Sequence, residues 1–178
     1  AARSGGKFTT AYPMTPASSI LHTLAKQAPK YNLVVKHVED EISAMNTAIG
    51  AGFTGVRAMT CTSGGGFCLM TEAWGMAGMM EVPIVAVEAM RTGPSSGMPT
   101  WGGQEDLKFV LNASHGEFPR VVLAPGDVEE CFIMMQQAFK MAEKYQTPVM
   151  VLTDKYLAAS RQSVSAKKLV PIAKERGQ

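Results

Sequence analysis

The sequence predicts an α/β protein with three layers, α/β/α, in which helices cover both faces of a mostly parallel sheet. Short apolar, β-branched stretches alternate with longer amphipathic stretches along the chain, a pattern typical of repeated strand–helix units. The stretch Ile84–Ala89 begins with four apolar residues, as expected for a strand buried on both faces. With 178 residues, 46% of them hydrophobic, the chain is long enough to bury one such core.

The individual elements follow from composition and spacing. Strands are expected where apolar and β-branched residues cluster: Phe8–Tyr12, Leu33–Val38, Val56–Thr62, Ile84–Ala89, Arg120–Ala124 and Val149–Thr153. Helices are expected between them: Ala17–Gln27, Glu41–Ala51, Phe67–Met80, Gln104–Leu111 and Val128–Lys144. Sheets of this kind bind ligands beyond the carboxyl ends of their strands, so the strand-to-helix junctions are the places to look for a site.

The first junction is Tyr12-Pro13-Met14-Thr15-Pro16. Each proline biases the residue before it toward extended backbone, so the strand stops here, and Pro16 is expected to open the next helix in its first turn. Thr15 then either caps that helix, the commoner use of such a residue, or presents its hydroxyl to a ligand.

The second junction, His37 to Glu41, carries three carboxylates in a row into a helix. Acidic residues in a first helical turn each stabilise the helix by roughly 0.3–1 kcal/mol, which is sufficient explanation for two of them. Glu41 also borders the apolar stripe of this helix, where a half-buried carboxylate could share a proton with a ring nitrogen of a ligand.

The third and fourth junctions are rich in glycine. Gly64, Gly65 and Gly66 would let a ligand approach the backbone amides closely, although a tight structural turn explains them equally well. The loop from Arg91 to Gly103 combines glycines, prolines and serines, and Arg91 is either a solvated residue or a donor fork for a carboxylate substrate. His115-Gly116-Glu117 is expected to shape a turn.

Composition excludes several classes of protein. No apolar run is long enough to span a membrane. The three cysteines show no metal-binding spacing and are expected to be reduced, buried and structural, as in a cytoplasmic protein. Residues 155–178 hold six basic side chains against one acidic, but few aromatic ones, so a connecting segment or solvated helix is expected rather than a nucleic-acid-binding tail.

Taken together, these segments resemble the α subunit of the 2-oxoacid:ferredoxin oxidoreductases (the pyruvate/2-oxoglutarate:ferredoxin oxidoreductase family). The resemblance is to the domain that binds the pyrimidine half of thiamine diphosphate, and it covers about residues 3–157. The matching stretches, in order, lie at residues 12–16, 39–41, 62–67, 91–100, 104–107, 115–119 and 145–149.

The resemblance implies the thiamine diphosphate-binding fold and the oxidative decarboxylation of a 2-oxoacid to its acyl-coenzyme A. In the family, the glutamate that matches Glu41 contacts N1′ of the pyrimidine ring, and the arginine that matches Arg91 binds the substrate carboxylate. Thr15 matches a threonine near the reacting centre and is expected to contact both cofactor and substrate. The further cofactor contacts that the resemblance implies are Tyr12, Pro13, Ser63, Gly64, Gly65 and Phe67.

Two motifs of such enzymes are missing from the chain. It has no Gly-Asp-Gly followed by asparagine for diphosphate and Mg²⁺, and no cysteine cluster for an iron–sulfur centre. The resemblance therefore implies a partner β subunit that carries Mg²⁺ and a [4Fe-4S] cluster, and an oligomer in which this chain supplies half an active site and is inactive alone. Gly65 stands where the family often has proline.

The remaining expectations concern substrate, partners and boundaries. 2-Oxoglutarate is favoured as substrate, with ferredoxin and coenzyme A as the other reactants, and neither nucleic acid nor membrane as a partner. The alternatives are a pyruvate or branched-chain 2-oxoacid enzyme, the pyrimidine domain of another thiamine enzyme, and an assembly module without chemistry. Residues 1–157 are expected to form the pyrimidine-binding domain and residues 158–178 a basic C-terminal connecting segment.

Overall fold

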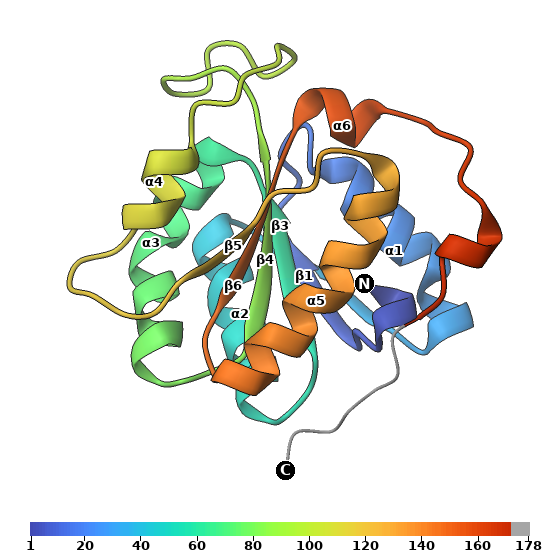
Figure 1. Cartoon of the computed structure of the whole chain (residues 1–178). Coiled ribbons are helices and arrows are strands. Elements are labelled where there is room, and N and C mark those ends of the chain that lie inside the picture. The colour runs from blue at the N-terminus through green and yellow to red at the C-terminus, as the bar shows by residue number, and fades with distance from the viewer. Residues whose placement is uncertain (172–178) are drawn as a thin grey trace.

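The computed structural model describes residues 1–171 and shows a six-stranded sheet between two layers of helices (Figure 1). The strand order is β2-β1-β3-β4-β6-β5, and every neighbouring pair is parallel. The strands are β1 (Phe8–Ala11), β2 (Val34–His37), β3 (Ala58–Thr62), β4 (Ile84–Met90), β5 (Val121–Leu123) and β6 (Val149–Asp154). The expected fold class is confirmed, and all six expected strands are present.

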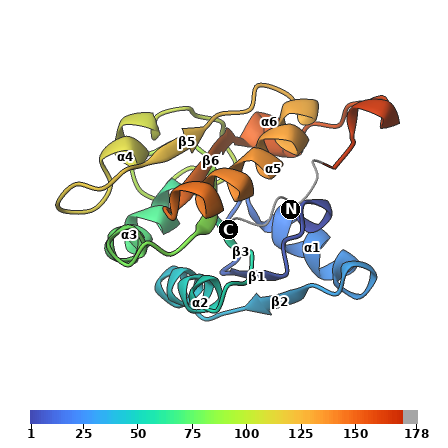
Figure 2. The same cartoon turned by 60° about the horizontal axis from the view of Figure 1, so that its bottom comes forward.

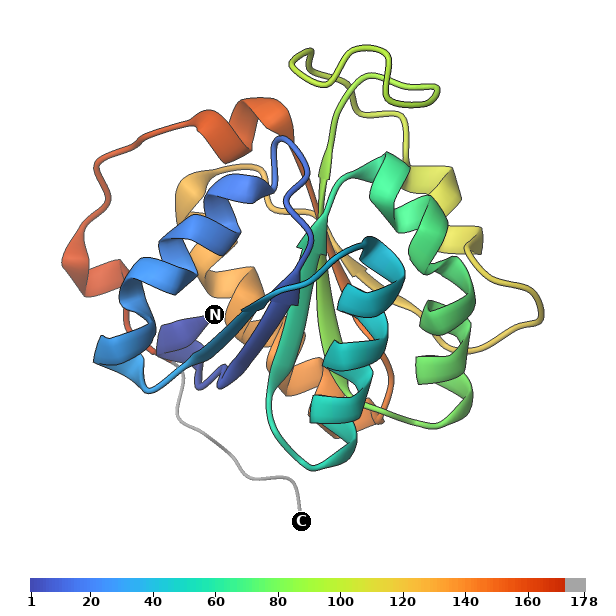
Figure 3. The ribbon, with the colours of Figure 1, turned by 180° about the vertical axis from the view of Figure 1, so that it is seen from behind.

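The helices divide between the two faces of the sheet, as Figures 2 and 3 show. One layer consists of α2 (Glu41–Phe53), α3 (Gly64–Met79) and α4 (Leu107–Asn112), and the other of α1 (Ser18–Tyr31) and α5 (Val128–Tyr145). Three short helical segments complete the described chain: η1 (Ala2–Ser4), α6 (Lys155–Ala159) and η2 (Ala166–Lys168).

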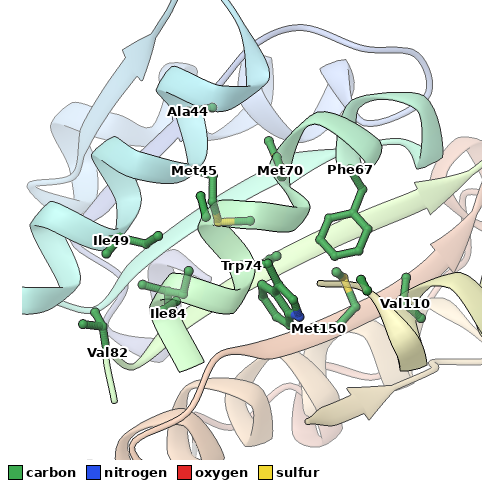
Figure 4. Close-up of a cluster of buried hydrophobic side chains, with 14 of the residues drawn as sticks. Ala44, Met45, Ile49, Phe67, Met70, Trp74, Val82, Ile84, Val110 and Met150 are labelled. Atoms are coloured by element: carbon green, nitrogen blue, oxygen red, sulfur yellow. The ribbon is translucent and has the colours of Figure 1, made fainter. Parts of the chain in front are cut away.

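Each face of the sheet has its own hydrophobic cluster. Under α2, α3 and α4, the Phe67 ring lies edge-on to Trp74, with 5.7 Å between ring centroids, and Met45 and Ile84 pack beside them (Figure 4). All seven residues of β4 are buried, so this strand forms the centre of the core, as its apolar sequence predicts. The side chains of β4 alternate between the two clusters, so successive residues of this strand pack on opposite faces of the sheet.

Aspartates begin three of the helices. Asp40 accepts a hydrogen bond from the Ser43 amide (2.7 Å), Asp127 from the Glu130 amide (2.8 Å) and Asp154 from the Leu157 amide (2.7 Å). Each bond satisfies one of the amide groups that have no partner within the helix. These caps fix where the chain leaves the sheet and enters the helix.

Two helix starts differ from the expectation. Pro16 does not open α1, which begins at Ser18 with Ala17 at the cap position, so Thr15 is not the cap either. The three glycines do not form a loop before α3 but its first turn, because the helix begins at Gly64 rather than at Phe67. Their amide groups are therefore those at the amino end of a helix.

The expected domain boundary lies in the C-terminal part of the chain. It follows residue 157 and so falls within α6, which packs near β6, and the boundary stays a prediction. Lys174 and Arg176 of the expected basic segment lie outside the described residues. Across residues 1–171, no helix has the length and hydrophobicity needed to cross a bilayer.

Candidate active site

Four strand ends bring the unusual junctions together. The strands β2, β1, β3 and β4 are neighbours in this order, and each is followed at its carboxyl end by one of the four junctions. Because all these strands are parallel, the four junctions lie along one edge of the sheet, above which the loop after β4 projects (Figure 1). The edge predicted to bind a ligand is therefore built from contiguous strands.

Arg91 ties two of these junctions together. It directly follows β4 and is only 7% exposed. Its Nη1 donates to the carbonyl oxygen of Thr15 (2.8 Å), and its Nη2 donates to the hydroxyl of Ser96 (3.1 Å). The Thr15 side chain is exposed, and its hydroxyl has no hydrogen-bond partner among the described residues. The Arg91 guanidinium is thus held by hydrogen bonds and is not freely solvated.

Glu41 is a buried acid at the start of α2. It is 4% exposed, and its Oε1 has no hydrogen-bond partner within the described part of the chain. The neighbouring acids have ordinary roles, since Glu39 is exposed and Asp40 caps the helix. Desolvating a carboxylate oxygen without a partner is costly, so this oxygen is a candidate for a hydrogen bond to a bound group.

The first turn of α3 fits against Glu41 only because it is made of glycine. A Cβ atom on Gly66 would lie 2.8 Å from both Cγ and Oε1 of Glu41 and would collide with the hydroxyl of Thr62. A Cβ on Gly65 would lie 3.4 Å from the Ser96 hydroxyl and 3.9 Å from Nη2 of Arg91. The glycine turn therefore lies between Glu41 on one side and Arg91 on the other.

The remaining expected site residues divide into two groups. Tyr12 is 38% exposed and Pro13 half-buried, both directly after β1, and Gly64 begins α3. The side chains of Ser63 and Phe67 are fully buried, and the Phe67 ring packs against Phe109 with 5.3 Å between ring centroids. The structure thus brings Tyr12, Pro13 and the glycines to the edge of the sheet, while Phe67 belongs to the core.

Other expectations from the sequence are settled by position. His115 to Glu117 lie between α4 and β5, where the chain bends and Gly116 has a φ of 67°. The cysteines are free as expected, but only Cys61 is buried; Cys131 is half-buried and Cys68 exposed. Residues 1–171 contain no group of three or more His, Cys, Asp or Glu side chains that could hold a metal ion.

Sequence reasoning missed two residues near this edge, Glu88 and Asp106. Glu88 lies in β4 and has no exposed surface, and Asp106 lies directly before α4 with its carboxyl group against Gly64. A signal for Glu88 was available, since a lone acid in an otherwise apolar strand is unusual. Nothing in the sequence pointed to Asp106 as its neighbour.

The protein family described as pyruvate flavodoxin/ferredoxin oxidoreductase, thiamine diphosphate-binding, matches residues 1–176 of the chain. The chain belongs to this family. The 2-oxoacid:ferredoxin oxidoreductase subunit alpha of Saccharolobus solfataricus is 47% identical over 177 residues, which span 93% of this chain and 28% of the relative. The 2-oxoglutarate synthase subunit KorA of Archaeoglobus fulgidus is 43% identical over 165 residues, 93% of this chain and 48% of the relative.

A solved structure of the same kind has the same fold. The 2-oxoglutarate:ferredoxin oxidoreductase from Magnetococcus marinus, described with 2-oxoglutarate, coenzyme A and succinyl-coenzyme A bound, superposes with a TM-score of 0.85 at 42% identity. The match covers 88% of this chain and 27% of that one. The chain therefore spans between about a quarter and half the length of the relatives it matches.

As a domain of the pyruvate flavodoxin/ferredoxin oxidoreductase family, the chain should offer a place for one ring of thiamine diphosphate. The structure fits this requirement on two observations. The buried Oε1 of Glu41 has no partner among the described residues, and Gly66 lets the first turn of α3 approach that carboxyl group closely. A ring nitrogen is a suitable partner for such an oxygen.

Proposed function

We propose that this chain supplies the pyrimidine-binding half of a thiamine diphosphate site in a 2-oxoacid:ferredoxin oxidoreductase. The observation that carries the proposal is the buried, unpartnered Oε1 of Glu41 next to Gly66. The match to a family whose domain binds this cofactor supports the proposal that the carboxylate holds a proton shared with N1′ of the pyrimidine ring. Tyr12, Pro13, Thr15 and the amides of Gly64 and Gly65 are the further proposed contacts of the cofactor. The buried side chains of Phe67 and Ser63 flank the glycine turn at the start of α3.

Arg91 and Thr15 are the proposed contacts for the substrate. When bound, thiamine diphosphate supplies an electron-accepting ring for decarboxylation. The guanidinium of Arg91 is fixed by its bonds to Thr15 and Ser96, and its buried Nε has no partner among residues 1–171. A fixed guanidinium orients a carboxylate at little further entropic cost, and Thr15, whose carbonyl oxygen Arg91 contacts, has an exposed side chain.

The proposed reaction converts a 2-oxoacid and coenzyme A into an acyl-coenzyme A, carbon dioxide and a proton, while two electrons pass singly to ferredoxin. 2-Oxoglutarate is the proposed substrate, supported by the names of the Archaeoglobus fulgidus relative and of the Magnetococcus marinus structure. Because residues 1–171 offer no metal-binding cluster, we assign Mg²⁺, the diphosphate group and the [4Fe-4S] cluster to a β subunit. We place the assembled oligomer in the cytoplasm.

A substrate screen with the native complex tests this function. The full-length protein is purified with its natural partners and supplied with 2-oxoglutarate, pyruvate or a branched-chain 2-oxoacid, together with coenzyme A and a viologen as electron acceptor. We expect the highest kcat/KM with 2-oxoglutarate and no viologen reduction without coenzyme A or thiamine diphosphate. A preference for pyruvate or a branched-chain acid would correct the substrate, and inactivity with all three would refute the proposed reaction.

A further inference from the structure

A buried acid in the central strand has no conventional partner. Glu88 has no exposed surface, and no N–H or hydroxyl group of the described residues donates to either of its carboxyl oxygens. Its strand neighbours in register are Thr62 and Leu152, and its side chain faces the same side of the sheet as Ala86 and Met90, toward α3 and α4. An ionised carboxylate in such surroundings would be strongly destabilising.

The group that Glu88 contacts is another carboxyl. Asp106 can share a hydrogen bond with Glu88 only when one of the two carboxyl groups carries a proton, because two carboxylates have no proton to donate. Burial, then the hydrogen bond and the charge of Asp106, raise the pKa of Glu88 to about 9. Asp106 occupies the cap position of α4, yet its side chain makes no capping bond there. Its carboxyl group instead lies against Gly64 and pairs with Glu88.

This acid pair lies between the two halves of the candidate site. On one side, Thr62 is in register with Glu88. Gly66 packs closely against both the Thr62 hydroxyl and the Glu41 carboxyl group. On the other side, Asp106 ends the segment that follows Arg91. The base of that segment is closed by bonds from the Thr92 hydroxyl to the Gly102 carbonyl (2.8 Å) and from the Gly93 amide to Glu105 (3.2 Å). The pair thus connects the strand, the glycine turn and the Arg91 loop.

We propose that Glu88 is a positioning residue, whose protonated carboxyl holds Asp106 and thereby keeps the first turn of α3 and the Arg91 loop in their places at the site. Loss of the proton sets two carboxylates against each other in the core and releases the loop. The effect on catalysis rests on the function proposed above, whereas the buried proton itself does not.

The surroundings of Glu88 identify the groups that could complicate a titration. They are Asp106 before α4, Cys68 on α3 and, beyond Gly66, Glu41 on α2, while the strand neighbours Thr62 and Leu152 carry no titratable group. No lysine or arginine of residues 1–171 forms a salt bridge with Glu88. Burial and the charges of Glu88 and Asp106 also raise the pKa of the Cys68 thiol, so Cys68 needs a control of its own.

The first experiment measures kcat/KM of the native complex between pH 6 and pH 10, a range chosen around the Glu88 pKa of about 9. The wild-type complex should lose kcat/KM by about tenfold per pH unit above that pKa. In Glu88→Gln, which keeps a donor for Asp106 but cannot ionise, this decline should vanish or move up by at least about one pH unit. Cys68→Ala should keep the wild-type decline. A Glu88→Gln complex that declines as the wild type does would overturn the proposal.

The second experiment detects the proton directly and needs no turnover. In infrared spectra, the C=O stretching band of a protonated carboxyl should be present at pH 7, disappear above the pKa of Glu88 and be missing from Glu88→Gln. Identical bands in both proteins would refute the buried proton, even in an active complex. A complex that shows the band but is inactive with every 2-oxoacid would instead refute only the proposed function.

A second variant keeps the proposal testable if Glu88→Gln does not fold. Asp106→Asn removes the negative charge that helps to raise the Glu88 pKa, so both the alkaline decline and the infrared titration should move to lower pH. An unchanged titration in this variant would show that the two carboxyls are not coupled, which contradicts the proposal.

Discussion

At the scale of single residues, the three consecutive acids at the start of α2 have three different environments. Glu39 is exposed, Asp40 caps the helix through the Ser43 amide, and Glu41 is 4% exposed with an unpartnered oxygen. Residues at adjacent positions point in different directions as the chain enters a helix, so identical chemistry in the sequence becomes different chemistry in space. Glu41 alone combines burial with an unsatisfied oxygen, which is why it is the proposed proton-holding group.

Replacing this carboxylate provides a direct prediction. Glu41→Gln in the native complex should lower kcat by about a hundredfold or more, because the amide cannot take up and return a proton at N1′. Assembly should persist, since the change conserves size. The measurements are steady-state turnover and size-exclusion chromatography, with Glu39→Gln as the matched control at an exposed position of the same segment. Turnover near the wild-type value in both variants would remove Glu41 from the mechanism.

At the scale of elements, the sequence predicts the strands and helices well but not how their ends meet. The mostly apolar β4 and the apolar stripe of α2 could be read from the sequence, because burial repeats with the period of the element. The start of α3 at Gly64 could not be read from the sequence, because glycine is a poor helix former and the apolar pattern begins only at Phe67. Its close packing against Glu41 and Thr62 is a tertiary contact that overrides this propensity.

The same argument explains which site residues could be predicted from the sequence and which could not. The strand-end rule placed Thr15, Glu41 and Arg91 along one edge without knowledge of any contact. The pairing of Glu88 with Asp106 was beyond reach, since the two residues are joined by an irregular loop that has no periodicity from which to infer a contact. Such pairings depend on loop geometry, which the sequence pattern does not contain.

Two glycine substitutions test the role of close packing at helix positions. Gly50→Ala in α2, where a Cβ would meet no atom within 4 Å, should stabilise the protein by about 0.5–1 kcal/mol through helix propensity. Gly66→Ala should instead lower both stability and turnover, because its Cβ would lie 2.8 Å from Glu41 Oε1. Thermal unfolding and kcat of both variants provide the measurement. Equal stabilisation by the two alanines would contradict the described packing.

At the scale of the whole molecule, large apolar side chains remain exposed near the candidate site. Tyr12 is 38% exposed, Met98 51%, Trp101 67% and Leu107 49%, and they belong to the first junction, the Arg91 loop and the start of α4. Other exposed apolar side chains, such as Phe53 and Met79, lie away from this edge, but those near a binding site are often covered by another protein. This agrees with the proposal that a β subunit completes the site from this side.

Trp101 offers the sharpest test of that surface. Trp101→Ala should weaken copurification of the proposed β subunit, because a large aromatic side chain contributes strongly at interfaces. Tyr145→Ala is the matched control, since Tyr145 is also an exposed aromatic residue but ends α5 ahead of β6, at the other edge of the sheet. Pull-down yields of the two variants are compared. An unaffected yield for Trp101→Ala, or an equal loss for both, would argue against this surface.

The order of the strands also affects whether two copies of the protein can associate by pairing their outermost strands. The two outermost strands are β2 and β5, with four and three residues, and β2 carries Lys36 and His37. Short outer strands are poor templates for strand addition by another chain, and the Lys36 charge on β2 disfavours it further. We therefore expect association to depend on side chains near the candidate site rather than on pairing between outer strands of the sheet.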